Sequence, residues 1–222
     1  MKIVYRYAVV AVAVAVLIAI GYRLAAFRPA GVSKNTANAP VAKSPSATSS
    51  GSVSEAVFAM PVDRAAGRIT KKPFGIKVAP GHSPVNPERF TGYHAGVDFE
   101  ILSGEENIDV PVYAICSGTL AEKIVATGYG GVAVQKCELS GRPITVIYGH
   151  IKISSVSFIA GDFIKKGNKI AVLGSAYSAE TGGERKHLHL GIHKGSGIDL
   201  LGYVQTPDEL KNWINFADYM SS

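Results

Sequence analysis

Three short motifs hold most of the side chains in this sequence that could bind a metal ion or move a proton. They are Tyr93-His94-Ala95-Gly96-Val97-Asp98, Tyr148-Gly149-His150 and His187-Leu188-His189. Imidazole nitrogens and carboxylate oxygens are ordinary zinc ligands, and a catalytic zinc site uses three protein ligands and keeps a fourth position open. The motifs could fill such a site and leave histidines over for proton transfer.

The third motif pairs two histidines. On a β-strand, side chains two residues apart point to the same face, so His187 and His189 would project together, roughly 6–7 Å apart along the strand. One of them can bind a metal while the other stands beside it. Taken alone, the pair is equally compatible with two surface histidines.

The first motif offers an imidazole from His94 and a carboxylate from Asp98. Gly96 lies between them and permits a sharp turn of the backbone. One histidine of the third motif would complete a set of three ligands. His150 and the histidine that does not bind the metal would then be free for acid–base chemistry.

Strands must position these motifs, and the chain after about residue 56 has the texture of strands. Short apolar runs rich in β-branched residues alternate with glycine-rich turns. The expected strands cover residues 110–114, 118–125, 131–134, 144–148, 170–173 and 188–192. Turns are expected at 128–131, 140–143 and 161–167. The pattern predicts an all-β domain, a mostly antiparallel sheet or sandwich.

One short helix is expected near the C-terminus. Thr206 can cap it, Pro207 suits the first helical position, and Glu209 completes a capping box. Apolar residues then recur at helical spacing, at Leu210, Trp213, Ile214 and Ala217. We expect this helix to pack against the sheet.

The start of the chain resembles an export signal. Lys2 and Arg6 precede an apolar run at residues 8–22. The run reaches the length of a membrane span only if Arg23 extends its charged end to the membrane surface. The segment is therefore either an uncleaved anchor in the membrane or a cleaved signal peptide.

Three regions follow from this composition. Residues 1–27 are expected to be the signal anchor or signal peptide. Residues 28–55 are rich in Ala, Ser, Pro, Asn and Thr, and such a segment cannot bury enough apolar surface to fold, so it is expected to be a disordered linker. Residues 56–222 are expected to form a single domain.

The positive charge of the chain is confined to its start. Residues 1–50 hold six Lys and Arg residues and no acidic residue, which accounts for the whole net charge of +6. The other 17 of the 23 basic residues balance 17 acidic ones. Because a DNA-binding domain would carry a basic footprint, we expect no nucleic-acid partner.

The two cysteines, Cys116 and Cys137, fall on or beside consecutive predicted strands, where cross-strand neighbours come within disulfide reach. A disulfide fits an exported protein, and two buried free thiols are the alternative. Two cysteines are too few for a four-cysteine zinc site.

In this order, the three motifs resemble those of the lysostaphin/LytM-type zinc peptidases, bacterial enzymes that cut peptide bonds in the stem peptides or cross-bridges of peptidoglycan. The segment 161–174 also resembles a glycine-rich segment of that family, and the likeness covers about residues 90–193. The resemblance implies that one zinc ion (Zn2+) is bound by His94, Asp98 and His189. It implies that His150 and His187 are catalytic.

The chain lacks the His-Glu-x-x-His motif that supplies a glutamate base in other zinc peptidases. A histidine must take that role, and imidazole titrates near neutral pH. We expect His187 to activate the water, and His150 to stabilise the developing oxyanion or share the role of base.

The sequence thus predicts a monomeric zinc metalloendopeptidase that acts on peptidoglycan outside the cytoplasm, held to the membrane by its N-terminal segment or secreted after cleavage. A non-catalytic wall-binding protein that regulates other cell-wall hydrolases is the main alternative. A zinc carboxypeptidase acting on D-amino-acid peptides is a third.

Several neighbouring residues receive a simpler interpretation. His82 is expected on a surface loop. His193 lies roughly 13 Å along the strand from His189, too far to share the metal, and is expected at a solvated strand end. Tyr148 should share the strand face of His150, where it either supports the site or packs in the core.

Two segments have open roles. Residues 182–186 could form a mobile loop in which Arg185 or Lys186 meets substrate carboxylates, or an exposed polar turn. Residues 56–90 could cover the cleft and keep the protein latent.

Overall fold

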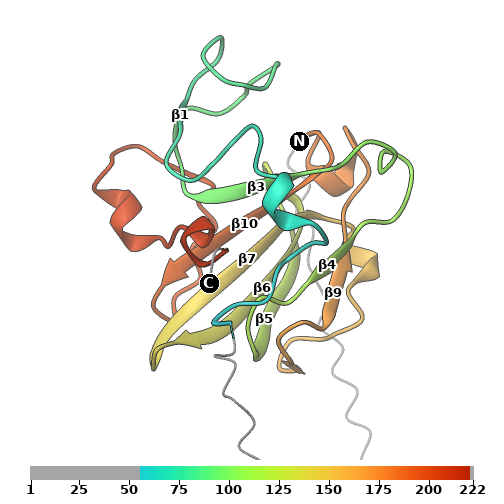
Figure 1. Cartoon of the computed structure of the whole chain (residues 1–222), viewed down its shortest axis with the longest axis vertical. Helices are drawn as coiled ribbons and strands as arrows, with labels where there is room; N and C mark the ends of the chain where they lie inside the picture. Colours follow the sequence, from blue (N-terminus) through green and yellow to red (C-terminus); the bar gives the residue numbers. More distant parts are fainter. Residues whose placement is uncertain (1–55, 221–222) are drawn as a thin grey trace, which may run out of the picture. The chain divides into compact units, whose positions relative to one another are not determined.

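The computed structural model describes residues 56–220, which form eleven strands and five short 3-10 helices (Figure 1). The strands are β1 (Lys77–Val78), β2 (Gly92–His94), β3 (Gly96–Glu100), β4 (Pro111–Tyr113), β5 (Gly118–Ala126), β6 (Gly130–Leu139), β7 (Arg142–Ile151), β8 (Phe163–Ile164), β9 (Lys169–Val172), β10 (His187–Lys194) and β11 (Tyr203–Val204). The 3-10 helices are η1 (Ala65–Gly67), η2 (Ile153–Ser155), η3 (Ala179–Thr181), η4 (Glu209–Asn212) and η5 (Phe216–Tyr219).

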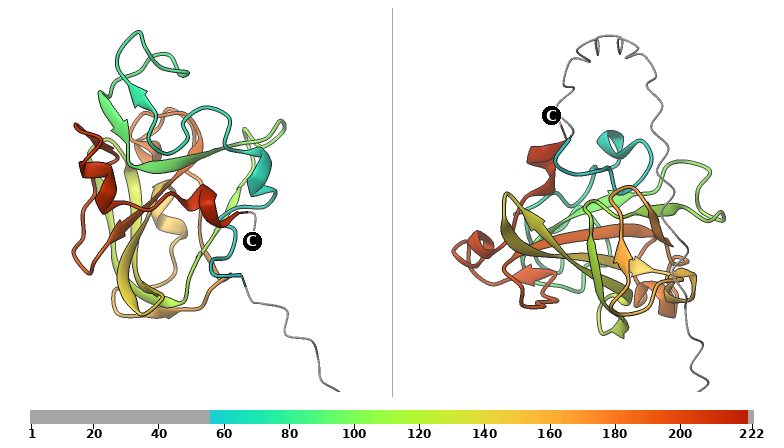
Figure 2. Two further views of the ribbon diagram at one scale, coloured as in Figure 1. Left: turned by 60° about the vertical axis from the view of Figure 1, so that its left-hand side comes forward. Right: turned by 90° about the horizontal axis from the view of Figure 1, so that it is seen from below.

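Six strands form one antiparallel sheet in the order β3-β10-β7-β6-β5-β8. Strands β1, β2 and β11 form a second sheet, and β4 pairs with β9. Figure 1 shows β10, β7, β6 and β5 side by side, and Figure 2 shows the same strands from two further directions. The main sheet therefore places the strands of the second and third motifs, β7 and β10, next to each other.

Both faces of the main sheet are buried, because side chains along each strand alternate between two apolar clusters. On β10, Leu188 and Leu190 belong to the larger cluster. On β7, Ile147 belongs to the smaller cluster on the opposite face. His187 and His189 alternate with the two leucines, so they lie on the face of the smaller cluster.

The mostly antiparallel all-β fold expected from the sequence is confirmed. The six expected strands correspond to β4, β5, β6, β7, β9 and β10. The strands that the sequence did not reveal have two to five residues, and β3 is buried on both faces, so none shows a clear alternation. The segment 161–167, expected to be only a turn, contains β8, which pairs with the start of β5.

The single C-terminal helix is replaced by η4 and η5. The expected capping box is present, because the N–H of Thr206 donates to the Glu209 carboxylate at 2.8 Å and the N–H of Glu209 donates to Thr206 Oγ1 at 3.4 Å. Trp213, however, has an extended backbone. The N–H of Ile214 donates to the carbonyl of Ile192 at 2.9 Å. Pairing with β10 therefore stops the helix after one turn.

A disulfide joins Cys116 to Cys137, which decides between the two alternatives left open by the sequence. Cys137 lies on β6 opposite Gly118, the first residue of β5, and Cys116 lies two residues before Gly118. A side chain at Gly118 would crowd the backbone of Lys136 and the sulfur of Cys137. The glycine thus leaves room for the bridge.

The segment before β1 is built into the core. Phe58 and Val62 are buried in the larger cluster. Arg68 is only 1% exposed and forms a two-pronged ion pair with Glu105, at 2.6 and 2.7 Å. These hydrogen bonds lower the pKa of Glu105 to about 2. The first part of the segment 56–90 is therefore a structural brace of the domain.

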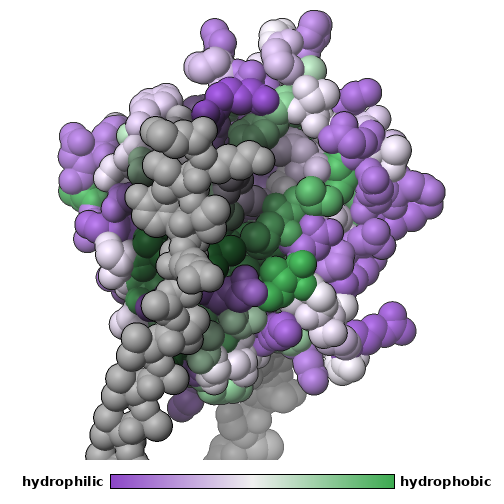
Figure 3. Space-filling view, turned by 180° about the vertical axis from the view of Figure 1, so that it is seen from behind, coloured by the Kyte–Doolittle hydropathy of each residue, from purple (hydrophilic) through white to green (hydrophobic). Residues whose placement is uncertain are grey.

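The outer surface is mixed. Seen from behind, hydrophobic side chains form a band between hydrophilic ones (Figure 3), as is usual for folded domains. Residues 56–220 contain no helix that is both long and apolar enough to span a membrane. The export signal and linker expected in residues 1–55 lie outside the described residues.

Candidate metal centre and active site

His94 and Asp98 belong to different sheets although they are four residues apart. His94 ends β2 and pairs with Tyr203 of β11. Asp98 lies in the middle of β3, opposite His189 of β10. Only Ala95 separates the two strands, so the chain passes there from the small sheet into the main sheet. This short crossing brings both side chains to one place.

The structure brings His94, Asp98 and His189 together in the interior. The Nε2 atom of His94 lies 3.0 Å from Nδ1 of His189 and 3.1 Å from Oδ1 of Asp98. The same Oδ1 lies 3.1 Å from Nδ1 of His189. All three residues are at most 3% exposed. Their donor atoms form a nearly equilateral triangle.

This triangle fits a metal ion. Nitrogen and oxygen ligands about 2.0–2.2 Å from a tetrahedral zinc lie about 3.3–3.5 Å apart, only slightly wider than the triangle. Two imidazoles and one carboxylate are also a ligand set typical of zinc. Among residues 56–220 these three side chains form a group that could hold a metal.

Gly96 serves close packing and not a sharp turn. Its φ is not positive, so the expectation of a special backbone path is wrong. A Cβ atom at Gly96 would lie 2.6 Å from Cε1 and 2.7 Å from Nε2 of His189. It would also lie 2.7 Å from the carbonyl oxygen of Leu190. The glycine therefore makes room for the imidazole ring of His189.

His150 reaches the site through a β-bulge. Gly131 of β6 faces Ile151 and Val132 faces Gly149, so His150 is an extra residue in β7. Its φ of 59° is left-handed, which is uncommon for any residue except glycine. A bulge re-aims a side chain, and the ring centroid of His150 lies 4.4 Å from that of His187.

Tyr148, two residues earlier, does not share the face of His150. Its side chain is buried in the larger cluster on the other side of the sheet. Its hydroxyl donates to Oε1 of Gln135 and accepts from the N–H of Ile115, both at 2.9 Å. Of the two roles left open, Tyr148 therefore has the packing role.

Backbone carbonyls orient three of the four site histidines. Nδ1 of His94 lies 3.2 Å from the carbonyl of Pro73, Nδ1 of His187 lies 2.8 Å from that of Arg185, and Nδ1 of His150 lies 3.0 Å from that of Thr181. In each case Nδ1–H donates, and Nε2 is left to act. His189 differs, because its Nδ1 faces the triangle.

Burial sets the protonation states of the site. Burial, followed by the charges of His187 and His189, holds the pKa of His150 well below its usual range. Burial lowers the pKa of His189 to about 4. Burial would raise the pKa of Asp98, but the charges of His94 and His187 outweigh it and hold that pKa well below its usual range. Neutral imidazoles and an ionised carboxylate are the forms that bind metals.

A cleft of about 280 Å³ opens beside the triangle. It is lined by Asp98, His150, His187 and His189, and further by Lys72, Phe90, Thr91, Thr127, Gly128, Tyr129, Glu184, Arg185, Leu200, Leu201, Gly202, Tyr203 and Gln205. A substrate in this cleft would therefore meet the metal group and also His150 and His187.

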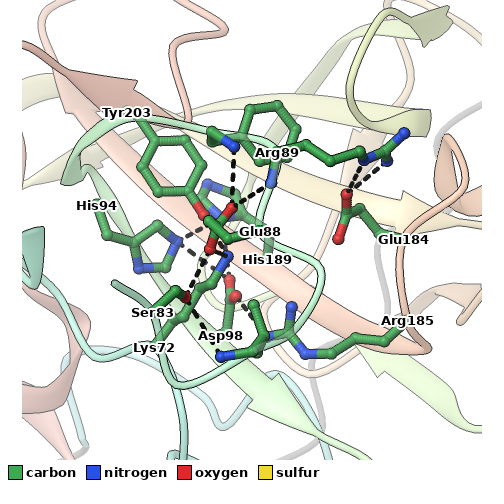
Figure 4. A network of polar contacts seen from close by, with 12 residues as sticks. Lys72, Ser83, Glu88, Arg89, His94, Asp98, Glu184, Arg185, His189 and Tyr203 are labelled. Carbon is green, nitrogen blue, oxygen red and sulfur yellow. Dashed lines mark hydrogen bonds and ion pairs between the residues drawn. The ribbon is translucent and has the colours of Figure 1, made fainter. Parts of the chain in front are cut away.

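Phe90 and Thr91 line the cleft, and the residues just before them are fixed by two ion pairs (Figure 4). Nζ of the buried Lys72 lies 2.6 Å from Oε2 of Glu88, and it donates to the hydroxyl of Tyr203 at 2.8 Å. The neighbouring Arg89 pairs with Glu184, another residue that lines the cleft, with 2.5 Å between Nη2 and Oε1. Part of the segment 56–90, through Lys72 and Phe90, is thus a wall of the cleft.

Of residues 182–186, Gly183 is exposed, whereas Glu184 and Lys186 are buried and Arg185 is partly buried. Lys186 is 6% exposed and donates to the carbonyls of Glu105, Glu106 and Ile108. Arg185 donates to the carboxylates of Asp98 and Glu100. Both cations therefore already have carboxylate or carbonyl partners, so the segment is not the exposed polar turn of the second interpretation, and a substrate carboxylate would have to compete with these partners.

The two remaining histidines lie apart from the metal group. His82 is exposed in the turn after β1, where it bridges to Ala79, as expected. His193 is partly buried instead of solvated, with its ring centroid 5.0 Å from that of Trp213 and its Nε2 4.0 Å from Asp199. The C-terminal segment that covers β10 accounts for this burial.

Comparison with known proteins agrees with this geometry. Residues 92–200 match the model of peptidase family M23. No curated protein matches the chain. Among solved structures, the catalytic domain of the antimicrobial peptidase lysostaphin from Staphylococcus simulans is similar, with 22% identity over 68% of this chain and 90% of that chain and a TM-score of 0.46.

Two further solved structures are similar. LytU has 22% identity over 70% of this chain and 86% of its own, with a TM-score of 0.47. Csd3 from Helicobacter pylori has 26% identity over 68% of this chain and 35% of its own, with a TM-score of 0.43. The family match spans all three motifs, from β2 past β10, and the chain therefore belongs to peptidase family M23.

Proposed function

We propose that this M23 peptidase is a zinc-dependent endopeptidase that hydrolyses peptide bonds in peptidoglycan. The observation that carries the proposal is the triangle of His94, Asp98 and His189 donor atoms, with His187 and His150 beside it in one cleft. Three protein ligands with a neighbouring base are the arrangement of a hydrolytic zinc site.

His94, Asp98 and His189 would hold the ion. Bound zinc supplies Lewis acidity, which lowers the pKa of water towards about 7 and polarises a peptide carbonyl. The low pKa of His189 keeps its imidazole neutral at physiological pH, and the ionised Asp98 contributes the one negative charge of the set. His189 and Asp98 thus need no proton release before they bind the metal at neutral pH.

His187 would act as the general base. Its Nδ1–H donates to the carbonyl of Arg185, which leaves the lone pair of Nε2 directed at the site. Nε2 lies 3.3 Å from Oδ2 of Asp98, so the carboxylate would stabilise the imidazolium once the proton has been taken. His187 could then return the proton to the leaving amine.

His150 would stabilise the developing oxyanion or share the role of base. Its Nδ1 hydrogen bond to Thr181 fixes the ring, and Nε2 is free. Its low pKa favours the neutral form at neutral pH. A neutral Nε2 accepts a proton more readily than it donates one, which favours a share in the role of base.

We further propose that residues 1–27 direct export and anchor the protein or are cleaved, that 28–55 are a linker, and that 56–222 are the catalytic domain of a monomer. The basic start and apolar run support the first part. The disulfide between Cys116 and Cys137 supports an oxidising compartment outside the cytoplasm.

The test is mass spectrometry of purified peptidoglycan after incubation with the full-length protein, with and without a zinc chelator. New peptide termini within stem peptides or cross-links that disappear with the chelator would establish the endopeptidase. Loss of terminal residues alone would indicate a carboxypeptidase. No product from zinc-loaded protein that nevertheless stimulates a separate wall hydrolase would overturn the proposal in favour of a regulator.

A further inference from the structure

We infer that Arg185 is a positioning residue that makes Asp98 bind its metal through a single oxygen. The inference rests on the proposed metal site and concerns a part of it that the three motifs do not contain. Arg185 lies two residues before His187 and continues the same face of the chain as His187 and His189. It therefore reaches the same side of β3 as Asp98.

The two oxygens of Asp98 have separate partners. Oδ1 points to the other two members of the metal group, 3.1 Å from each donor nitrogen. Oδ2 accepts from Nη2 of Arg185 at 2.8 Å and lies 3.3 Å from Nε2 of His187. Only Oδ1 is therefore free to bind a metal.

Glu100 holds the guanidinium in place. It lies two residues after Asp98 on the same face of β3, opposite His187 of β10. Nε of Arg185 donates to both of its carboxylate oxygens at 3.0 Å, and Nη2 lies 2.5 Å from Oε1. Arg185 and Glu100 are both largely buried, so this fork is shielded from water.

This arrangement decides the number of ligand atoms. A carboxylate can bind a metal through one oxygen or two, and the hydrogen bonds on the second oxygen select between them. Because Arg185 donates to Oδ2, the protein supplies three ligand atoms and not four. The remaining position stays open for water and substrate.

The experiment replaces zinc with cobalt(II) in the full-length protein and records the visible absorption, which is strong for four-coordinate cobalt and weaker at higher coordination numbers. We expect an intense band in the natural protein. We expect Arg185→Gln to weaken the band several-fold, because Asp98 can then bind through both oxygens. Arg185→Lys should behave like Arg185→Gln, because an ammonium lacks the fork that reaches both carboxylates.

The matched control is Arg89→Gln, which breaks the other arginine–carboxylate pair of the cleft without touching a metal ligand. It should keep the intense band. Because Arg185→Gln leaves the buried Glu100 with only the more distant Lys71, at 3.5 Å, the double variant Arg185→Gln/Glu100→Gln removes that charge in case the single variant fails to fold. It should show the same weak band.

An intense band in folded Arg185→Gln, or in the folded double variant, would overturn the inference. If Arg185→Lys alone kept the intense band, a positive charge at this position would be enough to hold Oδ2, and the two-pronged guanidinium would not be required. Absence of cobalt binding in the natural protein, or binding that survives loss of His94, would instead overturn the proposed metal site.

Discussion

The backbone carbonyl of Pro73 lies 3.2 Å from Nδ1 of His94, and this contact decides which nitrogen of His94 faces Asp98 and His189. A histidine that donates one N–H to a carbonyl is fixed in tautomer and ring orientation. Pro73 precedes the matched family region by nearly twenty residues. The metal group is therefore oriented by a part of the chain that holds none of its ligands.

Loss of one ligand should abolish metal binding. We expect His189→Ala to lower zinc affinity by more than about 100-fold, since even residues outside the ligand set typically contribute about 10–100-fold. Competition with a chromophoric chelator measures the affinity. His193 lies on the same strand but apart from the three ligands, so His193→Ala should leave the zinc affinity unchanged. An equal loss of affinity in both variants would contradict the ligand assignment.

Loss of the base should leave the metal in place. His187→Ala is expected to lower kcat by about 10²–10⁴-fold, the usual contribution of general acid–base catalysis, with metal content unchanged. Metal analysis and steady-state kinetics on a soluble peptidoglycan peptide separate the two effects. His150→Ala should lower kcat without loss of metal as well, and full activity in either variant would exclude that residue from catalysis.

Acid should destabilise the metal-free domain before it protonates most carboxylates. The pKa of His189 is lowered to about 4 and that of His150 is also low, so between about pH 6.5 and 4 the unfolded chain binds protons that the folded chain does not. The free energy of unfolding is therefore highest above pH 6.5. It falls with the pH below that value, by up to about 1.4 kcal/mol per pH unit for each of the two histidines.

Urea unfolding of chelator-treated protein across this pH range measures the effect. His189→Ala should flatten the slope of the unfolding free energy against pH, whereas His82→Ala, at an exposed turn, should leave this slope unchanged. An unchanged slope in His189→Ala would mean that burial does not lower the pKa of this histidine.

The brace before β1 should depend on its ion pair. Glu105→Gln leaves Arg68 buried with a weakened partner, and we expect a loss of about 3 kcal/mol in the free energy of unfolding. Asp208→Asn breaks the exposed pair with Lys211 and should cost less than about 1 kcal/mol. Denaturant titration compares the two, and equal losses would argue against the brace.

The strands and the three motifs could be predicted because their signals are local: apolar runs between glycines, and the spacing of His187 and His189. The position of His150 could not be predicted from alternation, since one extra residue in β7 puts Tyr148 and His150 on opposite faces. The C-terminal helix is shorter than its apolar spacing predicts, for a similar reason. Its capping signal is present, but pairing of Ile214 with β10 overrides helical spacing.

The buried charges outside the motifs gave no usable signal. Arg185 and Lys186 appear in the sequence as part of a polar turn, and only the folded chain shows which carboxylates and carbonyls they meet. Lys72 and Glu88 are sixteen residues apart, a separation at which sequence spacing says nothing about contact. Such pairs depend on tertiary packing.

The wall that Lys72, Phe90 and Thr91 contribute to the cleft has a consequence for how relatives can diverge. A fragment that began at Gly92 would keep all five motif side chains but lose the Pro73 carbonyl and both ion pairs that fix this wall. The reacting groups and the shape of the entrance thus come from separate stretches of the chain. Changes upstream of β2 can therefore alter which peptide fits the cleft while the reaction itself stays the same.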